Sequence, residues 1–242
     1  MLDVRYQHSY LLLGLAFLGV WFLFYVWRRD LRPKMRIVST VTAVLGPVAD
    51  TVYVQDWWSP LMVTNTRAGL EPVLAGFAIG GTASVLYQIV CKRTAVTRNG
   101  SAETVRRSNG ECLCFIASLI LLLFSCFYLL DLNSFESTLV GAIIPLGIMF
   151  VRRPDLLSVS CISGGLLVVV AALVYTFVEL LTPGWVQALW HFNNVPAIII
   201  AGLPINDVVF YFLTGAVIGP IYEYWKGIAF LARAKDPSAQ HV

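Results

Sequence analysis

The chain has 242 residues, of which 58% are hydrophobic and 13% are charged, and its formal net charge is +3. A soluble domain carries about 25% charged residues, so the composition excludes an ordinary water-soluble enzyme and favours an integral membrane protein. The apolar residues gather in blocks long enough to cross a bilayer, which predicts an all-α bundle of transmembrane helices. We expect no nucleic-acid partner.

Seven apolar blocks are predicted to span the membrane, with the basic residues concentrated in alternate loops. The predicted spans are Tyr10–Trp27, Ile37–Val54, Leu70–Val90, Cys112–Leu130, Ser137–Val151, Leu156–Leu181 and Leu203–Trp225. Every Lys and Arg except Arg5 and Arg67 then falls on one side, including those of the predicted loop Arg28–Arg36. Basic residues in short loops mark the cytoplasmic side, so we predict an outer N-terminus, a cytoplasmic C-terminus and residence in the plasma membrane.

The five cysteines predict neither a disulfide framework nor a metal site. None of them falls in a predicted outer loop. Cys112 and Cys114 are close in sequence, but two thiols without a nearby His or further Cys make a poor metal site, and we expect small apolar packing instead. No Gly-rich loop follows a predicted strand, which disfavours a flavin-dependent reaction, and we expect no cofactor.

The last predicted span has a weaker copy earlier in the chain. A shift of 135 positions matches Phe212 with Phe77, Gly215 with Gly80, Tyr222 with Tyr87, and Glu223 with Gln88. We therefore predict two parallel three-span repeats, residues 1–91 and 137–242, joined by a basic loop and spacer span at residues 92–136. Parallel repeats of this kind usually place their binding site at the repeat interface.

Two acids occupy adjacent positions of this repeated motif, Glu71 in the first copy and Asp207 in the second. A carboxylate at the mouth of a membrane helix is costly, and it is a functional-site hypothesis by default. Both acids fall near the predicted outer interface, where two further acids close their spans, and we predict Glu71 and Asp207 as the catalytic pair. The predicted substrate-binding residues are Asp50, Glu179, Tyr53, Trp57, Trp185, Phe210 and Tyr211.

This grouping of acids and aromatic rings suits proton chemistry on an apolar substrate. A carboxyl group in a poorly solvated place can stay protonated and donate its proton, and aromatic faces stabilise a developing cation. For any one acid alone, a helix cap or a hydrated helix end is the simpler interpretation. The repeat match favours function for Glu71 and Asp207, and it leaves both interpretations open for Asp50 and Glu179.

The paired motif spans resemble the lycopene cyclase domain of the small membrane-embedded carotenoid cyclases, which are built from two homologous halves. Members of that family carry a Pro-x-Glu-Glu/Asp pattern at the start of a span, once in each half. Residues Pro204-Ile205-Asn206-Asp207, followed by Phe210-x-Phe212, are similar to this pattern, and Gly69-Leu70-Glu71-Pro72 is a more distant match. Asn206 stands at the first acid of one copy, and Pro72 at the second acid of the other.

The resemblance implies an isomerase-type reaction, the acid-initiated cyclisation of a linear carotene end group without net redox change. It also implies a long apolar isoprenoid substrate, surrounding membrane lipid, and partner enzymes of carotenoid biosynthesis. Two alternatives stay open: a non-catalytic lipid- or carotenoid-binding membrane protein, and a carotenoid-modifying enzyme of another reaction type.

Two other classes of seven-span protein are disfavoured. A retinal protein needs a lysine within a span for its Schiff base, and the predicted spans contain none. The nearest lysine to the last span, Lys226, lies at its very end. A transporter or channel needs polar residues along the full depth of its bundle. Here the polar residues are predicted to cluster at one end, which suits a pocket for a lipid-like substrate.

Overall fold

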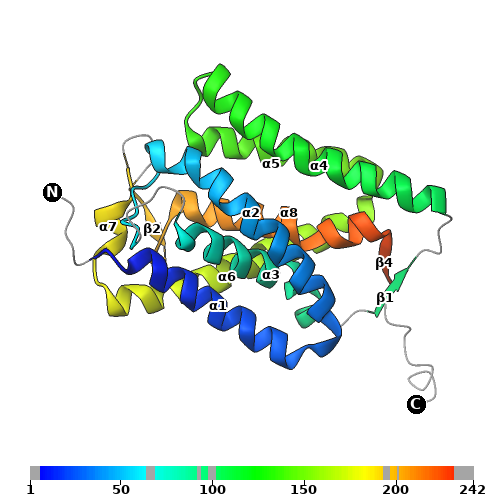
Figure 1. Ribbon diagram of the computed structural model, residues 1–242, viewed down its shortest axis with the longest axis horizontal. Helices are drawn as coiled ribbons and strands as arrows, with labels where there is room; N and C mark the ends of the chain where they lie inside the picture. Colours follow the sequence, from blue (N-terminus) through cyan, green and yellow to red (C-terminus); the bar gives the residue numbers. More distant parts are fainter. Residues whose placement is uncertain are drawn as a thin grey trace, which may run out of the picture.

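The computed structural model describes residues 6–63, 69–91, 94–97, 102–192, 197–200 and 202–231. The long helices run side by side (Figure 1). In chain order the elements are α1 Ser9–Trp27, η2 Arg29–Leu31, α2 Arg32–Asp56, α3 Leu70–Cys91, β1 Thr94–Thr97, α4 Ala102–Leu129, α5 Ser134–Arg152, η3 Pro154–Leu156, α6 Leu157–Leu181, α7 Trp185–Leu189, β2 Ile199–Ile200, β3 Leu203–Pro204, α8 Ile205–Lys226 and β4 Ile228–Leu231.

Seven helices in the described part of the chain are long and apolar enough to cross a membrane. Large apolar side chains on their outer faces are exposed, such as Leu129 at 77% and Val151 at 86%, as expected of surfaces that face lipid. The prediction of an all-α integral membrane bundle is therefore confirmed. Arg5, Arg67, most of the basic loop after α3 and the tail after residue 231 lie outside the described residues.

Local sequence signals set the helix ends. The Asn133 side chain accepts a hydrogen bond from the Glu136 backbone N–H at 2.8 Å, and the Glu136 side chain accepts one from the Asn133 N–H, a reciprocal cap that starts α5. Pro33 lies in the first turn of α2, where its missing N–H costs nothing. Gly227 ends α8 with a φ of 62°, a left-handed conformation that glycine adopts without strain.

The helices of the two halves correspond in length, which supports the proposed division into repeats. The pairs α1 and α5, α2 and α6, and α3 and α8 have 19, 25 and 22 residues respectively. The first two helices of each half are joined through a three-residue 3₁₀ turn. In one turn the Arg28 guanidinium donates two hydrogen bonds to the Asp30 carboxylate, and in the other the Arg153 guanidinium donates two to Asp155.

The central helices α3 and α8 contact each other, and each packs most extensively on a neighbour from its own half, α2 and α6 respectively. Glycines permit this close approach. A side chain at Gly76 would collide with the Thr42 carbonyl oxygen of α2, and one at Gly215 would lie 2.6 Å from the Ser163 carbonyl oxygen of α6. Gly80 likewise lies against the Thr42 side chain.

The predicted loop Arg28–Arg36 is wrong in its second part, because α2 already begins at Arg32. Lys34 is therefore inside a membrane-spanning helix, and the prediction that the spans contain no lysine is also wrong. Its side chain is buried, with Nζ 2.6 Å from Glu223 Oε1 and 3.3 Å from Gln88 Oε1. The ion pair compensates for the burial of the lysine, which a loop assignment based on charge alone does not anticipate.

Short elements cover the two ends of the bundle. The strands β1 and β4, which follow α3 and α8, pair antiparallel beyond the ends of those helices (Figure 1). At the opposite end, the helix α7 and the β2–β3 hairpin join α6 to α8. An isolated backbone bridge between Trp58 and Trp190 connects the segment after α2 to the segment after α7. This second end holds the candidate site.

Candidate active site

Asp207 is the acid with the most complete set of partners. It lies in the first turn of α8, three residues after Pro204, and is only 4% exposed. The Trp57 indole N–H donates to its Oδ1 at 3.0 Å, and the Tyr175 hydroxyl donates to its Oδ2 at 2.7 Å. The Trp190 indole nitrogen also approaches this carboxyl group, without meeting hydrogen-bond geometry. Donors to both oxygens stabilise the ionised form of the carboxyl group.

These partners come from distant parts of the sequence. Trp57 directly follows α2 in the first half, whereas Tyr175 lies on α6 and Trp190 follows α7 in the second. The hydrogen bond from Trp57 to Asp207 therefore joins the two halves of the chain at the carboxyl group.

Aromatic rings surround the Asp207 carboxyl group. Tyr53, Trp57 and Phe210 form a cluster in edge-to-face contact, with centroid distances of 5.4 to 5.7 Å. Tyr211 packs edge-on against Tyr175 at 5.9 Å. Ring faces carry partial negative charge, so this group of rings can stabilise a cation formed beside it.

Asp207 lies at one end of a mostly apolar cavity of about 610 Å³. The walls come mainly from α2, α3, α4, α5 and α8, with Tyr10 and Leu13 from α1 and Tyr175 from α6. Along α8 the lining extends from Asp207 to Trp225, which corresponds to about 27 Å at 1.5 Å per residue. The cavity is therefore elongated along the helices and has the size of a small-molecule binding site.

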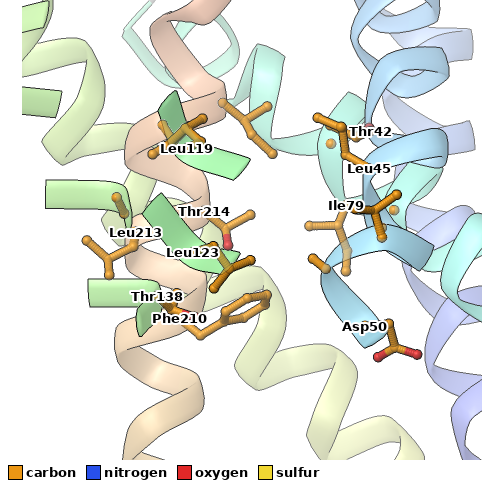
Figure 2. A pocket seen from close by; sticks show the side chains of 18 of the residues that line it. Thr42, Leu45, Asp50, Ile79, Leu119, Leu123, Thr138, Phe210, Leu213 and Thr214 are labelled. Carbon is orange, nitrogen blue, oxygen red and sulfur yellow. The ribbon is translucent and has the colours of Figure 1, made fainter. Parts of the chain in front are cut away.

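Helices from different parts of the chain face each other across this cavity, α2 and α3 on one side and α4 and α8 on the other. Figure 2 shows Leu45 and Ile79 on one side, and Leu119, Leu123 and Phe210 on the other. All of these side chains are apolar or aromatic. The cavity thus offers little to a polar ligand along most of its length, and its polar groups lie mainly at the ends.

Asp50 lies at the same end of the cavity as Phe210 (Figure 2). It is 5% exposed, and its Oδ2 has no hydrogen-bond partner among the described residues. The Trp58 indole lies beside this carboxyl group, and both line the cavity. The structure therefore brings Asp50 and Asp207 to one end of one cavity, in different hydrogen-bonding environments.

The other two predicted acids lie outside the described cavity lining and support loops. Glu71 Oε1 accepts a hydrogen bond from the Val63 backbone N–H at 2.7 Å, and Glu71 is only 1% exposed. Glu179 Oε1 accepts one from the Gly184 N–H at 2.8 Å, which fixes the turn into α7. Neither placement tests a catalytic role directly, but both match the alternative interpretation as structural caps.

The remaining predicted site residues divide between the cavity and the core behind it. Four of the predicted aromatic residues line the cavity: Tyr53, Trp57, Phe210 and Tyr211. Trp185 is fully buried outside the described lining, and it packs on the Tyr175 ring at a centroid distance of 5.0 Å. Trp185 therefore supports a cavity residue without belonging to the lining.

Sequence reasoning missed two parts of the site. Tyr175 is not among the predicted binding residues, although its hydroxyl donates the shorter of the two hydrogen bonds to Asp207. The wall formed by Leu119 and Leu123 was missed because α4 was interpreted as a spacer. Its leucine-rich sequence carries no signal that distinguishes a cavity wall from a lipid-facing surface. Among the described residues, no group of His, Cys, Asp and Glu side chains could hold a metal ion.

The fold and the site together define a membrane-embedded helical protein with buried carboxyl groups at the end of an apolar cavity. Residues 133–225, from the cap of α5 to the end of α8, match the family model described as Lycopene cyclase. This match agrees with the resemblance of the motif in the second half of the chain to that family. The match includes Asp207 and Tyr175 but not the first half of the chain. No curated protein and no solved structure matches the chain significantly.

Proposed function

We propose that this protein catalyses the acid-initiated, non-redox cyclisation of a linear carotenoid or a related polyprenoid. The observation that carries the proposal is the buried Asp207 carboxyl group, held by two donors at the aromatic end of an elongated apolar cavity. A linear isoprenoid matches this cavity because it is long, apolar and without groups that need hydrogen bonds. Its reacting end would lie beside the carboxyl groups, and its polyene chain would extend along α2, α4 and α8.

The proposed reaction needs a proton donor, cation stabilisation and a proton acceptor. Protonation of the terminal double bond leaves a tertiary cation, which the neighbouring double bond attacks to close a six-membered ring. The new cation then loses a proton to form the ring double bond, so no electrons are gained or lost overall. The rings of Tyr53, Trp57 and Phe210 and the Asp207 carboxylate can stabilise both cations electrostatically.

The assignment of roles follows from placement. We retain Asp207 as a catalytic residue because it lines the cavity, and we assign the aromatic lining to binding of the substrate end group. Glu71 holds the Val63 backbone in this proposal, because its bonded oxygen faces that segment. No cofactor is required by the chemistry.

The orientation in the membrane is a further part of the proposal. We propose an outer N-terminus and a cytoplasmic C-terminus in the plasma membrane, which puts Asp207 at the outer side. The charge distribution of the sequence supports this orientation. The enzymes that produce the linear substrate are the expected functional partners, because so apolar a molecule reaches the cavity through the membrane.

The experiment is co-expression in a bacterial host that accumulates a linear carotene, followed by separation of the pigments. The wild-type protein should convert part of the linear carotene into ring-containing product of the same mass. Membranes that contain the protein and are supplied with unlabelled linear carotene in D₂O should add one deuterium from solvent for each ring formed. Asp207→Asn keeps the size of the side chain but removes its acid–base function, so turnover should fall by about 10²- to 10⁴-fold.

The matched control is Asp56→Asn. Asp56 accepts a hydrogen bond from the Ser134 backbone N–H at 2.9 Å, outside the described lining of the cavity, and an Asn oxygen can still accept it. This variant should retain activity. If the purified protein carries pigment but neither variant nor wild type ever yields a ring, the non-catalytic binding alternative replaces the cyclase proposal.

A further inference from the structure

Two carboxyl groups share the aromatic end of the cavity, and their surroundings differ in one decisive respect. Asp207 has a hydrogen-bond donor on each oxygen. Asp50 has an indole neighbour, Trp58, but its Oδ2 is buried without a partner among the described residues. Asp207 thus has the donors that an ionised carboxylate needs, and Asp50 does not.

This difference bears on which of the two holds a proton. An ionised carboxylate that is buried without sufficient donors is strongly disfavoured, and no Lys or Arg is among the described residues that line the cavity. A neutral carboxyl group accepts one hydrogen bond and keeps an O–H free to donate. Asp50, with one indole neighbour and one free oxygen, fits the neutral form, whereas Asp207 fits the ionised form.

The correspondence of the two halves gives an independent reason to pair these residues. Counted from Arg32 in α2 and from Leu157 in α6, Asp50 and Tyr175 are both the nineteenth residue of a 25-residue helix. Both line the same cavity. At equivalent positions, the second half thus supplies a phenol that donates to Asp207, and the first half supplies a carboxyl group that is free to donate to a ligand.

We propose that Asp50 is the proton donor of the reaction, and that Asp207 is the carboxylate that faces the cation and takes up the proton released at the end. This inference rests on the proposed cyclase function and deepens it. The Asp50 O–H bond breaks as a C–H bond forms at the terminal double bond of the linear isoprenoid. After ring closure a C–H bond of the new ring breaks, its electron pair forms the double bond, and its proton goes to Asp207. Return of that proton to Asp50 restores the starting state.

The assignment can be tested without turnover by infrared spectroscopy of the purified protein at neutral pH. The C=O stretch of a protonated carboxyl group is distinct from carboxylate bands and shifts in D₂O. Asp50→Asn should remove one such band, whereas Asp207→Asn should leave that band in place. Asp30→Asn is the control, because both oxygens of Asp30 accept hydrogen bonds from the Arg28 guanidinium and this carboxyl group is already ionised. Loss of the band in Asp207→Asn instead, or no loss in Asp50→Asn, would overturn the assignment of the donor.

Turnover in the carotene-producing host separates this inference from the proposed function. Asp50→Asn should bind linear pigment but lower ring formation by about 10²- to 10⁴-fold, and Asp50→Glu should recover part of the activity. Asp207→Asn should also be slow, and its residual product should change in the position of the ring double bond, because the acceptor of the last proton has changed. If wild type and Asp50→Asn cyclise equally well, Asp50 is not the donor although the cyclase function stands. If wild type forms no ring, the cyclase function fails, and the infrared bands still decide which acid holds the proton.

Discussion

Replacement of Tyr175 by Phe removes one hydrogen bond to Asp207 and keeps the ring that packs against Trp185. The lost bond is 2.7 Å long and has a charged acceptor in the proposed mechanism. Such bonds contribute about 1.5–3 kcal/mol. At one factor of ten for each 1.36 kcal/mol, turnover should fall by about 10- to 150-fold. The loss stays below that of Asp207→Asn because the Trp57 N–H still donates to the other carboxylate oxygen.

The assay is the initial rate of ring formation in membranes supplied with linear carotene, with bound pigment measured in parallel. Pigment binding should be nearly unchanged, because Phe fills the same volume. Tyr128→Phe is the matched control, since the Tyr128 hydroxyl accepts a hydrogen bond from Gln55, outside the described cavity lining. Equal rates for Tyr175→Phe and wild type, or equal losses in both variants, would refute the role of this hydrogen bond.

Three further outcomes are expected. Glu71→Gln should leave ring formation close to the wild-type rate and lower stability by about 1 kcal/mol at most, because a Gln oxygen can still accept the Val63 N–H hydrogen bond. A loss of turnover as large as that of Asp207→Asn would restore Glu71 as a catalytic acid. Lys34→Met should destabilise the protein by about 3–5 kcal/mol, and a second change, Glu223→Leu, should recover most of the lost melting temperature. A single variant that melts like wild type would show that the ion pair is not buried. In a cysteine-free background, a cysteine at Gln187 should react with an impermeant reagent added to intact cells; if it is protected, the proposed orientation is reversed.

The sequence predicted the spanning helices well because each is an uninterrupted apolar block, and hydrophobic length is the dominant constraint in a membrane. The prediction failed where a membrane-spanning helix begins with charged residues. The block of basic residues from Arg28 to Arg36 was interpreted as a loop, whereas Pro33 starts a helix that carries Lys34 inwards to Glu223. A partner 189 residues away cannot be inferred from local composition.

The sequence indicated single residues for the candidate site, but it did not indicate how they are arranged around one another. Asp207 could be found because an acid in an apolar span is costly wherever it points. Its donors could not, because a Trp or Tyr near a helix end is equally typical of the membrane interface. Glu71 and Asp50 look alike in sequence, and they differ only in what lies beside them: a backbone N–H in one case and the cavity in the other.

The position of the cavity follows from unequal packing of two similar halves around α3 and α8. On one side, α3 is closely covered by α1 and α6, whereas the corresponding contacts of α8 with α5 and α2 are sparser. The helix α4 belongs to neither proposed repeat, and it contacts α5, α8 and α2 over this looser side. A bundle with full two-fold symmetry would have two equivalent cavities or none. The added helix instead closes one side as a single elongated cavity, so that Asp50 and Trp57 from one half and Asp207 and Tyr175 from the other meet at one reacting end.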